Sequence, residues 1–153
     1  MPAEVFDMWM LPAIESLGWK FTVVPDSVAA TNWDGFFGSR PPTFWAKANW
    51  RFLEFPLHAH LLNSADQARI GWIIEFAVQG KQTKAANLKN CKERFWAFAA
   101  YIKEHGKLPL PIIATISRGV IEIVDGFHRL AALFFLERAA GFRLPIWAPV
   151  SPR

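Results

Sequence analysis

The stretch Val120-Ile121-Glu122-Ile123-Val124-Asp125-Gly126-Phe127-His128-Arg129-Leu130-Ala131-Ala132 decides how this chain folds. Up to Val124 the residues have the composition and alternation of a β-strand, and from Phe127 onward they have the pattern of a helix. Asp125-Gly126 between them is a common turn dipeptide. The sequence therefore predicts a strand that turns directly into a helix.

The start of this helix carries an unusual charge. A helix N-terminus already has positive character, so its first turn ordinarily favours Asp or Glu, but here it holds His128 and Arg129. Cations at this position indicate a site for an anion such as a phosphate chain, and Gly126 would let that anion approach the backbone. The alternative is structural, with Asp125 as an N-cap and Arg129 paired to an internal carboxylate.

The flanking sequence predicts a small sheet with helices. Residues 111–116 and 120–124 are expected to form a hairpin around Ser117-Arg118-Gly119, and residues 127–140 a buried helix. The other expected elements are a helix over 3–17 kinked at Pro12, strands over 19–24, 51–57 and 145–150, a strand or short helix over 70–78, and a helix over 84–105 with Thr83 as its cap.

Residues 25–49 are expected to form a long irregular loop, because they are rich in Gly, Pro, Asn and aromatic residues. Such a loop is either a lid over a ligand or a plug at a core edge. In the first case Trp33, Phe36, Phe37 or Trp45 would stack on a base.

Composition limits the class of protein. A chain of 153 residues with 52% hydrophobic and 20% charged residues is long enough for one globular domain with a proper core. The single Cys91 lies on the apolar stripe of the 84–105 helix and is expected to be a reduced, packed thiol. No apolar run reaches membrane-spanning length, and the N-terminus lacks the pattern of a secretory signal. We expect a cytoplasmic protein without a membrane partner.

Positive charge is concentrated in one segment. Residues 81–107 carry an excess of five positive charges, whereas the remainder of the chain sums to −1. This segment is either the solvated face of an amphipathic helix or a surface that attracts nucleic acid. The lysines expected to contact DNA in the second case are Lys81, Lys84, Lys89 and Lys92.

Two histidines, His58 and His60, could share one face of an extended segment and bind a metal together with a carboxylate such as Asp66. Solvated or hydrogen-bonded histidines are the commoner outcome. We therefore assign no metal site.

The order of these segments resembles the ParB/sulfiredoxin-like superfamily. Its members have a Pro-Ile strand, matched here by 108–113, a box of the form D-G-x-H-R-x-A-A or G-x-R-R, matched by 125–132, and a closing strand, matched by 144–147. The resemblance covers residues 108–150, with 52–62 as a counterpart of the family's first strand. Residues 1–50 match nothing in the family.

The resemblance implies a nucleotide-phosphate site at the box. Sulfiredoxins have a nucleophilic Cys where this chain has Phe127, so their redox chemistry is not expected. The box is similar to that of free serine kinases, which use a separate acidic residue as the base. In this chain Glu54 or Glu75 would have to provide that base. ParB proteins bind CTP through a G-x-R-R box, and in this chain His128 stands in place of the first Arg. ParB proteins also carry a helix-turn-helix domain after the box, for which the remaining chain is too short.

We therefore expect an α+β fold, a small mixed β-sheet packed with helices and similar to ParB/sulfiredoxin, with an aromatic-rich N-terminal extension over 1–50 and the main domain over 51–153. Gly126, His128 and Arg129 are expected to bind phosphate, and Asp125 and His128 are the candidate catalytic residues. ATP, ADP or CTP with Mg²⁺ are the expected ligands. The sequence leaves open a small phosphotransferase, a non-catalytic nucleotide switch or DNA-associated module, and a scaffold whose box is only structural.

Overall fold

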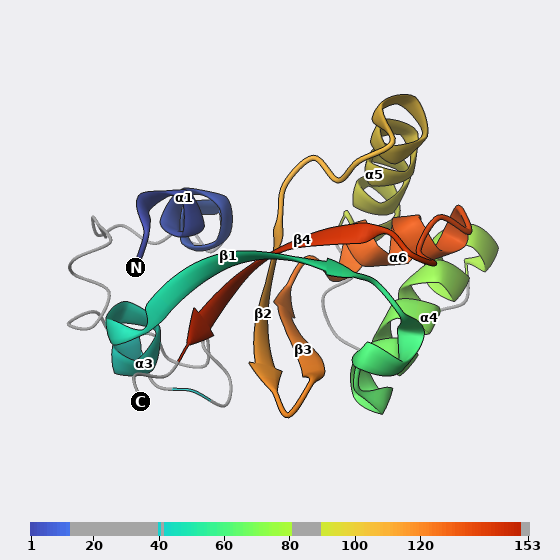
Figure 1. The fold of residues 1–153 in the computed structure, drawn as a ribbon. Helices are drawn as coiled ribbons and strands as arrows, with labels where there is room; N and C mark the ends of the chain where they lie inside the picture. Colours follow the sequence, from blue (N-terminus) through green and yellow to red (C-terminus); the bar gives the residue numbers. More distant parts are fainter. Residues whose placement is uncertain (13–39, 41, 81–89, 151–153) are drawn as a thin grey trace. The chain divides into compact units, whose positions relative to one another are not determined.

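The computed structural model describes residues 1–12, 40, 42–80 and 90–150 (Figure 1). Along the chain its elements are α1 (Ala3–Val5), the π-helical turn η1 (Phe6–Met10), α3 (Pro42–Lys47), β1 (Asn49–Pro56), the 3-10 turn η3 (Ala59–Leu61), α4 (Ser64–Gln79), α5 (Cys91–His105), β2 (Ile112–Ser117), β3 (Val120–Asp125), α6 (Phe127–Phe135) and β4 (Arg143–Val150).

The strands form a mixed, four-stranded sheet in the order β1-β4-β2-β3, and the fold class is α+β as predicted. β2 and β3 pair antiparallel with Ser117 opposite Val120, which confirms the predicted hairpin. Arg118 and Gly119 close it, both at positive φ (50° and 79°). Two such residues in succession give a turn whose twist matches that of the flanking strands.

The outer strand β3 is attached to the start of α4. Leu62 forms a parallel bridge with Ile121, and the Ile123 backbone N–H donates to Asp66 Oδ2 at 2.7 Å. Asn63 caps α4 by accepting from the Asp66 N–H at 2.8 Å, and its own amide donates to the Asp66 carboxylate at 2.9 Å. Asp66 therefore joins the helix cap to the strand, and burial raises the pKa of its carboxyl group.

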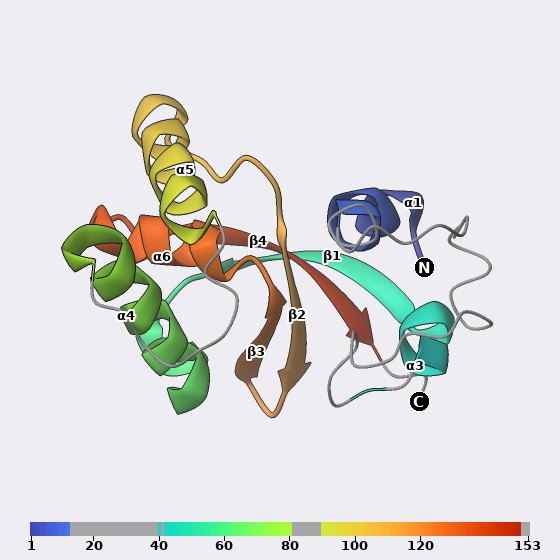
Figure 2. The ribbon, with the colours of Figure 1, turned by 180° about the vertical axis from the view of Figure 1, so that it is seen from behind.

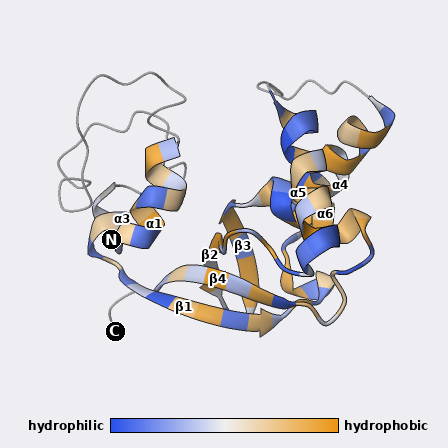
Figure 3. Cartoon of the chain, turned by 90° about the horizontal axis from the view of Figure 1, so that it is seen from above, coloured by the Kyte–Doolittle hydropathy of each residue, from blue (hydrophilic) through white to orange (hydrophobic). Residues whose placement is uncertain are grey.

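The helices α4, α5 and α6 pack against one another (Figures 1 and 2). Each bears hydrophobic residues as well as hydrophilic ones (Figure 3). Fully buried side chains such as Ile73, Phe95, Ile102, Leu130 and Leu133 come from all three helices. This packing decides the alternative left open for residues 70–78, which belong to the α-helix 64–79 and not to a strand.

Three predicted boundaries are wrong. The helix expected over 84–105 is interrupted at Asn90, which is left-handed (φ 62°), so α5 begins at Cys91, and residues 84–89 lie outside the described ranges. The helix expected to reach residue 140 ends at Phe135, because Leu136 leaves the helical conformation and Glu137 has φ 56°. The loop expected over 25–49 is helical at Pro42–Lys47, a segment whose proline stands at the first helical position.

The chain divides into two compact units. One comprises Met1–Phe52 with Trp147–Arg153, and the other comprises Leu53–Ile146. In the first unit, Trp45 is 2% exposed and its ring lies 5.2 Å from that of Trp9 and 6.1 Å from that of Trp50. Trp45 is thus a core residue of this unit, whereas one prediction had it stacking on a ligand.

Several predictions fall on residues outside the described ranges. These are the strand over 19–24, most of the loop over 25–49 with Trp33, Phe36 and Phe37, the cap Thr83, and the basic residues Lys81, Lys84 and Lys89. Across the described ranges, none of the helices combines the length and apolar character needed to span a bilayer.

The attachment of β3 to α4 can be tested with Asp66→Ala. The substitution removes the acceptor of the buried Ile123 N–H, so we expect the free energy of unfolding to fall by about 1–3 kcal/mol. Urea unfolding followed by circular dichroism measures this change. Glu75→Ala, at an exposed position of the same helix, is the control and should change stability by less than about 0.5 kcal/mol. Equal effects of the two substitutions would contradict a structural role for Asp66.

Candidate anion-binding site at the start of α6

The turn into α6 is shaped by contact with the sheet. Gly126 has φ 113°, a conformation that residues with a side chain rarely adopt. A Cβ built on it would lie only 2.6 Å from Ile112 Cγ2, on the neighbouring strand β2. Glycine is therefore required because the turn packs directly on Ile112. The close approach of a phosphate, which we predicted from the same glycine, stays a prediction.

Arg129 is directed into the protein. The residue is 5% exposed, and its guanidinium donates to the Asp125 carboxylate and to the backbone carbonyl groups of Leu110 and Pro111, the bond to Leu110 measuring 3.1 Å. These contacts connect the end of β3 and the start of α6 to the segment that leads into β2. They are the internal pairing that the structural interpretation of the sequence proposed. Any phosphate contact of Arg129 would have to be made in addition to them.

His128 lies where the starts of α5 and α6 meet. Its Nε2 is 3.3 Å from the thiol of Cys91, the first residue of α5, which is 3% exposed. Burial lowers the pKa of His128 to about 4, and the positive charges of Arg94, Arg69 and Arg129 act in the same direction. Burial also raises the pKa of the Cys91 thiol. At neutral pH the pair is thus an uncharged imidazole beside an uncharged thiol.

Two exposed arginines surround this turn. Arg69 of α4 places its guanidinium carbon 4.1 Å from the centre of the Phe127 ring, a cation–π contact, and Arg94 comes from the first turn of α5. No side chain that the structure describes accepts a hydrogen bond from the N–H groups at the start of α6. The positive charges of two neighbouring helices therefore act on an uncapped helix start.

The sequence predicted only part of this arrangement. It placed Gly126, His128 and Arg129 at the helix start, and the structure keeps them together there with Asp125, whose side chain is 30% exposed. It included Arg94 only as one of the cations of the 81–107 segment. It gave no indication of Arg69 or of the contact with Cys91, which lie 59 and 37 positions before His128 in the chain. Their charge was visible in the sequence, but their position depends on how the helices pack.

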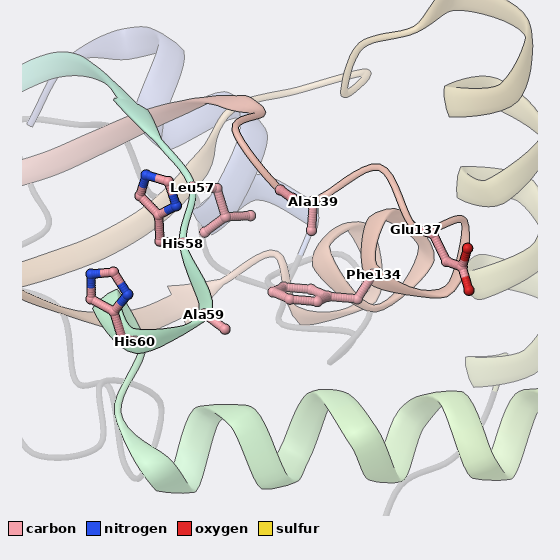
Figure 4. Close-up of a pocket in the computed structure, with 8 residues that line it drawn as sticks. Leu57, His58, Ala59, His60, Phe134, Glu137 and Ala139 are labelled. Atoms are coloured by element: carbon pink, nitrogen blue, oxygen red, sulfur yellow. The ribbon is translucent and has the colours of Figure 1, made fainter.

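A pocket of about 630 Å³ lies elsewhere in the same unit, by the C-terminal end of α6 (Figure 4). Leu57, Phe134 and Ala139 form part of its wall, together with His58 and His60. None of the predicted phosphate-binding residues lines it. The pocket is thus separate from the candidate anion-binding site at the N-terminal end of α6.

The two histidines of this pocket do lie together, as predicted. Their rings are stacked, with centroids 5.5 Å apart and planes within 7°. Asp66, the carboxylate considered as a third metal ligand, is instead bonded to Asn63 and Ile123. Within the described residues, no group of three or more His, Cys, Asp or Glu side chains is arranged to hold a metal ion.

Comparison with known proteins gives no match. No protein-family model, no curated protein and no solved structure is significantly similar to the chain.

Replacing Arg129 tests its internal role. Arg129→Ala leaves Asp125 and two carbonyl groups without their donor, so we expect a loss of about 3 kcal/mol in the free energy of unfolding. The matched control is Arg143→Ala, since Arg143 forms an exposed ion pair with Glu54 at 3.5 Å and should cost less than about 1 kcal/mol. Both values come from urea unfolding. A loss at Arg129 no larger than that at Arg143 would show that the buried contacts do not stabilise the fold.

The lowered pKa of His128 predicts a pH dependence of stability. Between pH 6.5 and about 4 the unfolded chain binds a proton that the folded chain does not, so stability falls as the pH decreases through this window. The largest loss is about 3 kcal/mol, and partial exposure of the ring reduces it. Unfolding midpoints at pH 7 and pH 4.5 should differ less for His128→Gln than for the wild type. An identical pH dependence in the variant would mean that other groups cause the loss.

Proposed function

We propose that this chain is a ParB/sulfiredoxin-like domain that binds the phosphate of a nucleotide, or a similar phosphate ligand, at the start of α6. The observation that carries the proposal is that the charges of Arg69 and Arg94 act on His128 at a helix start that no side chain caps. The two arginine charges and the positive end of the helix dipole repel one another, and a bound anion relieves that repulsion. The resemblance of the 125–132 box to nucleotide-binding members of the superfamily supports the same ligand.

Each residue of the proposed site would have its own role in binding the phosphate. Arg69 and Arg94 are exposed and supply charge, while the first-turn N–H groups and His128 donate hydrogen bonds. Arg129 holds the turn in place through its internal bonds. Asp125 uses Oδ2 to pair with Arg129, and Oδ1 is left to bind the Mg²⁺ that accompanies a nucleotide. The ion would neutralise phosphate charge.

Phosphoryl transfer to a small hydroxyl acceptor is the activity that this site would support. Such transfer depends mainly on positioning and charge neutralisation, with an acidic group to orient the acceptor. The two candidates for that group are both exposed, Glu54 in an ion pair with Arg143 and Glu75 on α4. The alternative to a phosphotransferase is a non-catalytic nucleotide switch, in which the same site binds the nucleotide without turnover.

Ligand binding at the start of α6 can be measured by thermal shift. ATP, ADP, CTP and inorganic phosphate, each with Mg²⁺, are titrated against the wild type and against a variant carrying Arg69→Gln and Arg94→Gln. We expect at least one ligand to raise the melting temperature of the wild type, because a ligand that binds only the folded state stabilises it. The double variant should lose most of that shift, because it lacks the exposed charges beside the helix.

Lys47→Gln with Arg51→Gln is the control, since these exposed residues carry the same charge and belong to the other compact unit. Sulfate adds a second readout because it does not change charge between pH 7 and pH 5. A bound anion raises the pKa of His128, so sulfate should bind more tightly at pH 5. An equal shift in both double variants, or no shift with any ligand, would refute the proposed site.

A further inference from the structure

An exposed indole and two lysines form one stripe along α5. In an α-helix each residue advances by about 100°, so Lys92, Trp96 and Lys103 lie within about 40° of one another around the helix axis. All three are exposed, and Trp96 is 41% exposed. Ala100 follows Trp96 by one helical turn, is exposed and is small, so its side chain leaves room beside the indole.

The indole is fixed in place although it is exposed. The Trp96 ring makes T-shaped contacts with Phe95 at 5.1 Å and with Phe135 of α6 at 5.4 Å between ring centroids. Phe95 is fully buried and also contacts Phe135, so the indole is anchored on the core of its unit. A held aromatic ring loses little conformational freedom when a ligand stacks on it.

The lysines of the stripe are not neutralised. Neither Lys92 nor Lys103 forms an ion pair with any residue that the structure describes. The acidic residues of α5, Glu93 and Glu104, point about 60–80° away from Trp96 around the helix. The stripe therefore presents two free positive charges, about 16 Å apart along the axis, with an aromatic ring between them.

From this arrangement we propose that α5 binds single-stranded nucleic acid, with a base stacked on Trp96 and backbone phosphates at Lys92 and Lys103. Stacking on an aromatic side chain combined with cations along the backbone is the way proteins bind single strands without reading sequence. A duplex keeps its base faces stacked on one another, so the indole would find no partner there. This inference concerns a different surface from the anion site at α6 and does not depend on it.

The test is fluorescence anisotropy with labelled oligo(dT) and oligo(U) over a range of salt concentrations. Trp96→Ala should weaken binding roughly tenfold and leave the salt dependence unchanged, because it removes stacking and no charge. Lys92→Gln with Lys103→Gln should reduce the slope of log K against log[salt] by about 1.4, because two phosphate contacts are lost. Trp96→Phe should restore part of the affinity lost in Trp96→Ala.

The matched control is again Lys47→Gln with Arg51→Gln, which removes the same charge from the other compact unit and should leave the slope unchanged. Melting curves of every variant establish that it is folded at the assay temperature. Three outcomes would overturn the proposal: no binding of either oligonucleotide by the wild type, equal affinity for duplex DNA or polyglutamate, or an unchanged affinity in Trp96→Ala. Loss of nucleotide binding at α6 would have no bearing on these results.

Discussion

The guanidinium of Arg129 makes the contact on which the centre of the larger unit depends. It bonds at once to the Asp125 carboxylate and to the carbonyl groups of Leu110 and Pro111, which belong to the end of β3 and the approach to β2. Gly126 lets the turn rest on Ile112 in the same place. A charged group that is 5% exposed is tolerated only because these oxygens surround it. The Arg129 bonds and the glycine contact together connect the start of α6 to β2 and to the segment before it.

That internal role changes which residues can meet a ligand. With Arg129 occupied, the accessible positive charge at the start of α6 comes from Arg69 and Arg94 on the other two helices. His128 contacts the buried Cys91 thiol, and burial together with the arginine charges keeps its imidazole neutral at physiological pH. The proposed anion site is therefore a product of helix packing, with the 125–132 box supplying the helix start and the neighbouring helices supplying the charge.

The predictions from sequence succeeded where one local signal was sufficient. The hairpin around Arg118-Gly119 follows from turn chemistry, and β1 and β4 follow from their composition. They stayed open where the signal was ambiguous and were wrong where it was absent. An apolar run such as 70–78 suits a helix and a strand equally, and nothing in the sequence shows that Asn90 adopts a left-handed conformation or that α6 stops at Phe135. The resemblance to a superfamily remains a proposal that rests on the 108–150 segment.

By itself the sequence determined an α+β chain in which a strand from Val120 turns at Gly126 into a helix that starts at Phe127, because residue alternation and glycine conformation act over a few neighbouring positions. It left two roles open for Arg129, since a lone cation at a helix start serves a ligand or a structural carboxylate equally well. Only the tertiary structure decided that the guanidinium faces Asp125 and two carbonyl groups, and that Arg69, Arg94 and Cys91 surround His128. The physical reason is that desolvation and charge contacts depend on distances in space, which separations along the chain do not fix.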